Sequence, residues 1–308
     1  MALRYLIGRY AGIPVTIAHG GTVGRSENRA MLRVLRVKPV PAARVDYRRY
    51  DLVCVVDSQP ATGYASLPEG VRADVVFDHH PLREPLPGAR LVEIDEKAGS
   101  TCTLLGEMIL FNGIPVGQEV ATALVYGMKA ETQDLGREAG RRDEEVYTGL
   151  YPLANQRLLS RILSERVTRP YFGSFARALL RARLHGPAVL SDLGEVPVPD
   201  VVPELADFLL RLREARWSCV VGSFQSRLYV SVRAGDPTLR ADRALRRALR
   251  GMGASGGHGC MAGGQIPLHG MTGEEVLAVR REFLRGFLAA LRVKDREGRP
   301  LVDAAGPD

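Results

Sequence analysis

The stretch Asp74–Leu82 reads DVVFDHHPL, and the interpretation of the whole chain starts from it. A short apolar, β-branched run ends in Asp78, His79 and His80, and Pro81 closes it. Burying a carboxylate and two imidazoles at the end of a strand costs free energy unless each group has a partner. The stretch therefore predicts a buried strand whose carboxyl end carries a polar site.

A second run, DLVCVVD at 51–57, has the same form and ends in Asp57. Apolar runs of this kind alternate along the chain with helical patterns, which indicates a parallel sheet covered on both faces. Ligands gather at the carboxyl ends of such strands, so we expect Asp57 and the residues 78–80 on one edge. Carboxylate and imidazole together suit manganese, iron or zinc better than calcium. A hydrogen-bonded cluster without a metal is the alternative.

Apolar periodicity also predicts the other elements of the chain. Ser26 and Ser100 are the candidate N-caps of two of the helices. Helices are expected over 2–10, 26–35, 100–114, 143–154, 201–213, 239–253 and 272–291. The segment 118–132 is a mostly apolar run that leads into the polar residues 131–134. Further strands are expected over 13–19, 188–196, 217–224 and 227–234, the last two as a hairpin-like pair.

Composition limits the class of protein. The chain has 308 residues, 45% hydrophobic and 25% charged, which is ordinary for a globular protein long enough for two domains. No apolar run approaches the roughly 20 residues of a membrane span. The four cysteines are scattered singly, which favours a reducing, cytoplasmic setting. A net charge of +7, carried almost wholly by arginine, gives a modest positive field suited to phosphorylated partners.

These patterns predict an α/β protein of two domains. A parallel-sheet domain is expected at 1–154 and a helical connector at 155–185. A smaller α/β domain is expected at 186–295, followed by a polar tail at 296–308.

Four motifs occur in an order and spacing that resemble those of the DHH phosphoesterases. They are VVDSQP at 55–60, VVFDHHP at 75–81, ATALVYGMKAETQDLGRE at 121–138 and SGGHGCMAGG at 255–264. The resemblance covers nearly the whole chain and includes the DHH-associated C-terminal domain. It implies metal-dependent hydrolysis of phosphodiester or phosphomonoester bonds, as in RecJ-type exonucleases and nanoRNA hydrolases. The alternative, that the chain is a relative of the manganese pyrophosphatases, agrees less well with the C-terminal motif.

The resemblance also implies roles for single residues. Asp57 and His79 would hold the metal, with Asp78 supporting His79 as a hydrogen-bond partner. His80 would face the scissile phosphate. Glu131 stands where the family usually has a metal-binding aspartate, with a side chain one methylene longer.

In the C-terminal domain, the resemblance makes Gly256, Gly257 and His258 the segment that grips substrate. Glycines let backbone N–H groups approach a phosphate closely, and an imidazole can donate to it. Arg233 matches a basic position that could pair with a phosphate. Without the family context, a glycine cluster of this kind is more often a turn.

The family's first motif, His-x-x-Pro-Asp-x-Asp at the end of the first strand, does not occur in this sequence. The nearest candidate starts at His19 and lacks both aspartates. Two interpretations stay open: the motif has degenerated, or the chain lacks its true N-terminus. We favour the second, in which His19 is not a ligand, because the pattern opens inside a helix with no preceding strand. Asp134 is the substitute ligand if the register at Glu131 is shifted.

The expected function is that of a metal-dependent phosphoesterase, impaired in this chain. Mn²⁺ is the expected cofactor, with Mg²⁺ as the alternative. The expected substrates are a short oligonucleotide, a nucleotide or another small phosphorylated molecule. A protein that binds nucleotides or nucleic acid without catalysis is the alternative function. The oligomeric state stays open, with a dimer among the options.

Overall fold

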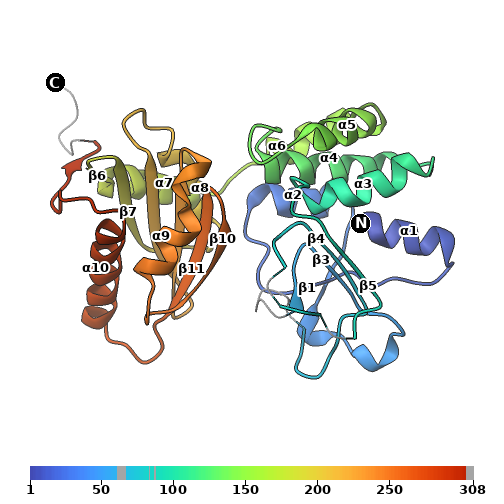
Figure 1. Ribbon diagram of the computed structural model, residues 1–308, viewed down its shortest axis with the longest axis horizontal. Coiled ribbons are helices and arrows are strands. Elements are labelled where there is room, and N and C mark those ends of the chain that lie inside the picture. Colours follow the sequence, from blue (N-terminus) through green and yellow to red (C-terminus); the bar gives the residue numbers. More distant parts are fainter. Residues whose placement is uncertain (61–66, 83, 87, 303–308) are drawn as a thin grey trace. The chain divides into compact units, whose positions relative to one another are not determined.

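The computed structural model describes residues 1–60, 67–82, 84–86 and 88–302 of the chain (Figure 1). The chain forms two compact units, Met1–Glu165 and Arg166–Asp308. The first contains parallel strands with helices, and the second contains a larger mixed sheet with helices. This confirms the predicted α/β class with a parallel sheet.

The strands of the first unit form two separate groups. Three of them pair in parallel in the order β3-β4-β5: β3 (Cys54–Val56), β4 (Val75–Asp78) and β5 (Leu91–Ile94). The other two, β1 (Ala18–His19) and β2 (Val40–Pro41), form a parallel pair of their own. Within the described residues, β3 therefore has a strand on one side only, and so does β1.

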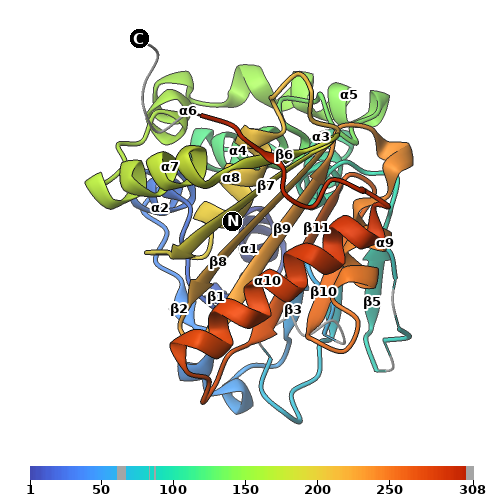
Figure 2. The same cartoon turned by 90° about the vertical axis from the view of Figure 1, so that its left-hand side faces the viewer.

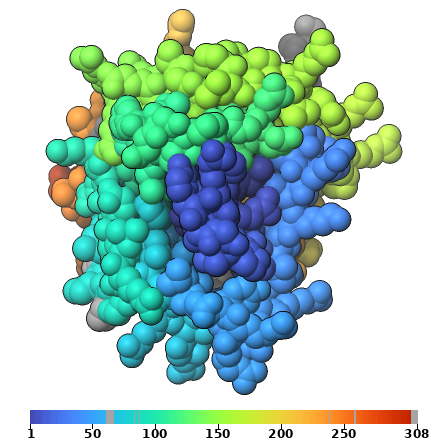
Figure 3. All heavy atoms as spheres, turned by 90° about the vertical axis from the view of Figure 1, so that its right-hand side faces the viewer, coloured from blue at the N-terminus to red at the C-terminus, as the bar shows by residue number. Residues whose placement is uncertain are grey.

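The core of the first unit lies mainly between helices. Figure 3 shows α1 lying against the green helices of this unit, and α1 contacts both α3 and α4. Phe77 of β4 joins this core, whereas Val55 and Val76 belong to a small cluster on the other face of the sheet. The helices are α1 (Ala2–Tyr10), α2 (Ser26–Val34), α3 (Thr101–Phe111), α4 (Gln118–Thr132), α5 (Arg141–Leu150) and α6 (Gln156–Leu163).

The second unit has one seven-stranded sheet in the order β10-β11-β9-β8-β7-β6-β12. β7 and β8 pair in parallel and all other neighbours are antiparallel, including the β8–β9 hairpin that the sequence predicts. The strands are β6 (Arg183–His185), β7 (Ala188–Glu195), β8 (Trp217–Phe224), β9 (Arg227–Ala234), β10 (Ala254–His258), β11 (Met261–Pro267) and β12 (Arg299–Pro300).

Helices cover both faces of this second sheet. α9 (Ala241–Ala248) and α10 (Gly273–Ala290) pack on one face, where Trp217 of β8 meets Phe287 edge-on with ring centroids 6.4 Å apart. Figure 2 shows α10 crossing that face. α7 (Arg169–Arg181) and α8 (Val201–Leu209) pack on the other face. The sequence predicts helices on both faces of the parallel sheet. The structure shows this arrangement for the sheet of the second unit instead.

The expected connector at 155–185 contains two helices and a strand. α6 packs on α2 in the first unit, α7 packs on β7 in the second, and β6 belongs to the second sheet. The expected tail at 296–308 contributes β12, which pairs with β6, and its residues 303–308 lie outside the described residues. No helix in the described part of the chain is long and apolar enough to cross a membrane.

The two predicted caps differ in outcome. The hydroxyl of Ser100 accepts a hydrogen bond from the backbone N–H of Thr103 and caps α3, as predicted. The prediction for Ser26 is wrong, because the N-cap of α2 is Arg25. Ser26 is the first helical residue, and its hydroxyl donates to the carboxylate of Glu27, 2.9 Å away.

Candidate metal and phosphate site

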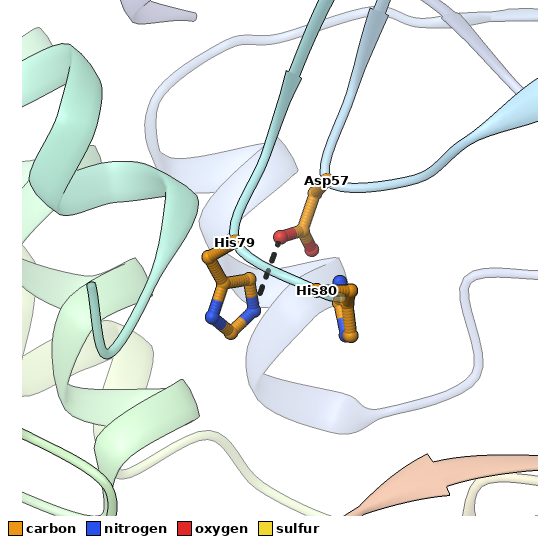
Figure 4. Close-up of side chains that lie close together, drawn as sticks. All are labelled: Asp57, His79 and His80. Carbon is orange, nitrogen blue, oxygen red and sulfur yellow. Dashed lines mark ion pairs between the residues drawn. The ribbon is translucent and has the colours of Figure 1, made fainter. Parts of the chain in front are cut away.

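Three side chains gather at the carboxyl edge of the β3-β4-β5 sheet. One potential ligand atom each from Asp57, His79 and His80 lies within 4.8 Å of the others (Figure 4). Asp57 follows the last residue of β3, and the two histidines follow the last residue of β4. The parallel register of β3 and β4 brings the two strand ends to one place, which is the arrangement that the sequence predicts.

Asp57 sits at a turn that starts as soon as β3 ends. Its N–H still donates to the carbonyl of Phe77 at 2.8 Å, but its φ of 64° is in the left-handed region. Aspartate tolerates this region better than most residues. Its carboxylate accepts a hydrogen bond of 2.7 Å from the Thr101 hydroxyl at the start of α3. The backbone and α3 together therefore fix the direction of this half-exposed carboxylate.

The ring of His79 is held so that one nitrogen faces Asp57. Its Nδ1 lies 3.2 Å from the carbonyl oxygen of Ala98, and a carbonyl can only accept, so Nδ1 is the protonated nitrogen. In the neutral ring, Nε2 then presents a lone pair, 3.7 Å from Oδ1 of Asp57. This separation is too long for a hydrogen bond but suits two ligands of one cation with bonds of about 2.0–2.2 Å. The donor set fits one divalent transition-metal ion.

Asp78 is buried and organises the turn that carries the histidines. Its carboxylate accepts hydrogen bonds from the backbone N–H of His79 at 2.9 Å and from Nδ1 of His80 at 2.8 Å. Burial raises the pKa of this carboxyl, but the hydrogen bonds from His80 and Gln59 outweigh burial and leave the pKa lowered. The hydrogen bond to Asp78 raises the pKa of His80, against the opposing effect of burial. Asp78 is thus an ionised acceptor that keeps a proton on His80.

Sequence reasoning missed two residues that position these groups. Gln59 is buried, and its amide lies 2.8 Å from Asp78 and 3.2 Å from the carbonyls of both His80 and Pro81. Thr101 holds Asp57. Gln59 belongs to the motif at 55–60, so its place in the sequence is a signal. The partner of Thr101 is 44 residues away, and the sequence carries no sign of it.

Glu131 and Asp134 lie outside the group of three ligand atoms found among the described residues. Glu131 is in the last turn of α4, near enough that its charge contributes to the raised pKa of His80. Asp134 has a positive φ and forms an ion pair with Lys129. The metal role predicted for Glu131 stays a prediction.

The residues expected to grip substrate belong to the second unit. Arg233 is buried, and its guanidinium pairs with the carboxylate of Asp207 at 2.7 Å and with the Ser231 hydroxyl at 2.8 Å. Gly256 and Gly257 lie in β10, paired with β11, and His258 ends that strand. The φ of Gly257 is 130°, and a Cβ at this position would overlap the carbonyl oxygen of Met261. The glycines are thus strand residues whose backbones pack closely, and Arg233 has a structural partner.

Comparison with known proteins finds a relative that covers most of the chain. No family model matches. An uncharacterised protein of Methanocaldococcus jannaschii is 28% identical over 270 residues, which are 87% of this chain and 54% of that protein. The chain therefore spans about half the length of this curated relative.

Two solved structures are similar to the chain in different degrees. The fold is similar to that of an exopolyphosphatase-related protein from Bacteroides fragilis, with a TM-score of 0.63 and 14% identity over 90% of this chain and 93% of that one. At this identity the likeness concerns the fold alone. A pGpG-specific phosphodiesterase from Vibrio cholerae aligns over 89% of this chain and 99% of its own, at 13% identity and a TM-score of 0.39, too low to support an argument.

Proposed function

We propose that the chain hydrolyses phosphoester bonds with the help of a divalent cation, Mn²⁺ or alternatively Mg²⁺, held at the carboxyl edge of the first unit's sheet. The observation that carries the proposal is the gathering of Asp57, His79 and His80 within 4.8 Å. The four ordered motifs that resemble the DHH phosphoesterases support it. When bound, the cation would activate water and neutralise charge on the phosphoryl group.

The chain's own residues would hold the cation and orient the substrate. Asp57 and His79 are the ligands, each fixed by a hydrogen bond to a group outside its own strand. His80 donates a hydrogen bond to a phosphoryl oxygen, and the contact with Asp78 keeps its ring in one orientation. Glu131 contributes negative charge near this edge and is the candidate for a further ligand.

The proposed substrates are small phosphorylated molecules: a short oligonucleotide, a nucleotide or a related phosphate ester. The net charge of +7 favours a polyanion. The fold is shared with a protein described as exopolyphosphatase-related, which fits a phosphorylated substrate. Gly256, Gly257 and His258 are the proposed contacts in the second unit. Arg233 is the weaker candidate because Asp207 already holds its guanidinium.

One observation favours the second candidate function, a protein that binds nucleotides or nucleic acid without turnover. Only three potential ligands gather in the described part of the chain, whereas a site that clamps a phosphate between two cations needs more. On this account the chain would bind one ion weakly and hold a phosphorylated ligand.

The two functions differ in a combined titration and hydrolysis assay. The chain is stripped of metal, titrated with Mn²⁺, and then incubated with a short RNA, a short single-stranded DNA, a 3′,5′-bisphosphate nucleotide and a cyclic dinucleotide. We expect one Mn²⁺ site and slow hydrolysis that EDTA abolishes. A His80→Gln variant should keep the Mn²⁺ site and lose turnover. Ligand binding without turnover supports the second function, and the absence of Mn²⁺ binding contradicts the metal site.

A further inference from the structure

A short segment at 98–103 contacts two of the proposed metal ligands of the first unit. It leads from the loop after β5 into the first turn of α3. The carbonyl oxygen of Ala98 lies 3.2 Å from Nδ1 of His79. The hydroxyl of Thr101 donates to the carboxylate of Asp57 at 2.7 Å. We call residues 98–103 the bracket. Because the bracket holds both ligands, a group that fixes the bracket also fixes the ligand atoms.

Asp143, in the first turn of α5, holds the bracket at two points. Its side chain is completely buried. Its Oδ1 accepts hydrogen bonds from the backbone N–H of Gly99 at 2.9 Å and from the hydroxyl of Thr103 at 2.5 Å. Its Oδ2 accepts from the backbone N–H of Gly140, the N-cap of α5, at 2.9 Å. All three neighbours donate, so the site suits a carboxylate, which only accepts.

One peptide unit connects Asp143 to His79. The carbonyl of Ala98 and the N–H of Gly99 belong to the same planar peptide bond. The N–H donates to Asp143, and the carbonyl accepts from Nδ1 of His79. Hydrogen bonds in a chain polarise one another, so the carboxylate at the N–H end makes the carbonyl a stronger acceptor. A stronger acceptor favours the proton on Nδ1 and leaves Nε2 free to bind a cation.

Gly99 lies where only a glycine fits. A Cβ at this position would be 2.9 Å from both the carbonyl oxygen of Glu138 and Cγ2 of Thr132. It would also be 3.0 Å from Oδ1 of Asp143. The end of α4, the loop after it and α5 thus enclose this peptide. The enclosure keeps the N–H of Gly99 directed at Asp143.

The alternative is that Asp143 only caps α5. Its contact with Gly140 belongs to a capping box, and the start of α10 has a capping box too. There Glu275 accepts from the backbone N–H of Thr272 and is exposed. An exposed side chain is thus sufficient for a cap, whereas burying a carboxylate costs free energy unless further donors satisfy it. The further donors to Asp143 come from the bracket, 40 and 44 residues earlier in the chain.

We propose that Asp143 is a positioning residue of the metal site, which acts on His79 through the peptide between Ala98 and Gly99 and on Asp57 through the bracket. The inference rests on the proposed function, since the cation concerned is the one held by Asp57 and His79. It predicts that the ring of His79 carries its proton on Nδ1 in the metal-free chain. It also predicts that the affinity for the cation depends on Asp143, although Asp143 acts through other residues.

Asp143→Asn tests the proposal, because asparagine has nearly the same shape but presents an NH2 group to neighbours that all donate. The tautomer of His79 is read from nitrogen-15 NMR of its ring in the metal-free protein, with signals assigned by His79→Gln. We expect the unaltered chain to hold the proton on Nδ1 and the Asp143→Asn variant to lose this preference. We expect its Mn²⁺ affinity, measured by calorimetric titration, to fall about 10- to 100-fold.

Two controls separate positioning from stability. Gly106→Ala crowds Val146 between α3 and α5 without removing a polar side chain. Glu275→Gln replaces the capping carboxylate of α10 in the second unit. Both variants should keep the His79 tautomer and the Mn²⁺ affinity, compared at a temperature where circular dichroism shows each protein folded.

An unchanged His79 tautomer in Asp143→Asn overturns the proposal. An equal loss of Mn²⁺ affinity in Gly106→Ala also overturns it, because packing of α3 on α5 would then explain the effect. If Asp143→Asn does not fold, the unaltered chain decides: a proton on Nε2 of His79, or a Gly99 amide that exchanges freely with solvent, contradicts the connection. Absence of Mn²⁺ binding contradicts the proposed function, whereas the tautomer in the metal-free chain still tests the role of Asp143.

Discussion

The two units use their strands differently. The second unit pairs seven strands into one sheet, and helices cover both faces, so most of its core is sheet packed against helix. The first unit divides its strands into a pair and a triplet, and most of its core lies between helices. Among the described residues, the longest strands of the first unit have four residues, whereas β7, β8 and β9 have eight each. In the second unit the sheet therefore supplies much of the core, whereas in the first the strands mainly bring polar side chains to one edge.

Backbone conformation shows the same contrast. In the second unit, the positive φ values of Gln225 and Ser226 belong to the tight turn between β8 and β9. In the first unit, Asp57 and the three consecutive residues 133–135 have positive φ values at the ends of β3 and α4. Such conformations cost of order 1–3 kcal/mol each and cluster at functional sites. In the first unit, one residue with a positive φ, Asp57, is itself a candidate ligand.

The largest effect should follow from removing a ligand at the first unit's edge. Asn tolerates the left-handed φ of position 57, so Asp57→Asn should keep the fold and lose the charged ligand. We expect Mn²⁺ affinity to fall more than about 100-fold, close to 3 kcal/mol, measured by calorimetric titration. The control is Asp46→Asn, which removes an exposed carboxylate that pairs with Arg48. Equal affinities in the two variants would show that the ion binds elsewhere.

The next effect tests the sheet of the second unit. Gly257→Ala places a Cβ 2.6 Å from the Cα of Ala262 at a φ of 130°. We expect a loss of about 2–3 kcal/mol in the free energy of unfolding, measured by urea denaturation. Gly263→Ala is the matched control on β11, because the nearest atom to its Cβ, the carbonyl oxygen of Val230, is 3.8 Å away. If both variants lose the same stability, close packing of β10 on β11 is not what requires Gly257.

A smaller effect should follow from loosening the turn that carries the histidines. Gln59→Leu removes the donor to Asp78 and to two carbonyls. We expect the free energy of unfolding to fall by about 1–2 kcal/mol and Mn²⁺ affinity to fall about tenfold. Gln265→Leu, which removes a hydrogen bond to exposed Arg227, should change neither quantity. A loss of stability with unchanged Mn²⁺ affinity would separate Gln59 from the site.

The smallest effect tests whether the core of the first unit lies between helices. Gly8 is exposed in α1, and a Cβ added there would meet no atom within 4 Å, so Gly8→Ala should stabilise by about 0.5–1 kcal/mol. Gly106 is the contrast, because a Cβ there would lie 2.5 Å from Cγ1 of Val146 on α5. Gly106→Ala should destabilise despite the better helix propensity of alanine. Thermal unfolding followed by circular dichroism measures both, and equal signs would contradict tight packing of α3 on α5.

The sequence predicts much of the fold and the centre of the site. The strands ending at Asp57 and Asp78 follow from their apolar runs, and the strand-end rule brings Asp57 together with His79 and His80. β4 is recognised from its own residues, whereas β5, which also has four residues, is not among the predicted strands. The β8–β9 hairpin follows from two adjacent strand-like runs and the short turn between them.

What the sequence does not predict depends on partners far along the chain. Arg233 carries the same charge whether it meets a phosphate or a carboxylate, and only the fold brings Asp207 to it across 26 residues. β12 is a two-residue strand with no sequence pattern of its own, and it is a strand because it pairs with the edge of β6. The cavity between β1 and β3 likewise depends on how these two strands are spaced, which no local pattern encodes.

Trp217 gives the second unit an optical signal of its own. The chain has a single tryptophan, and its ring packs against Phe287 in the core beneath α10. Indole fluorescence therefore reports on the environment of the second unit alone, whereas circular dichroism averages over both units. Denaturation curves from the two methods coincide only if the units unfold together. This one ring thus lets a simple fluorimeter show whether the two halves of the chain are one cooperative system or two.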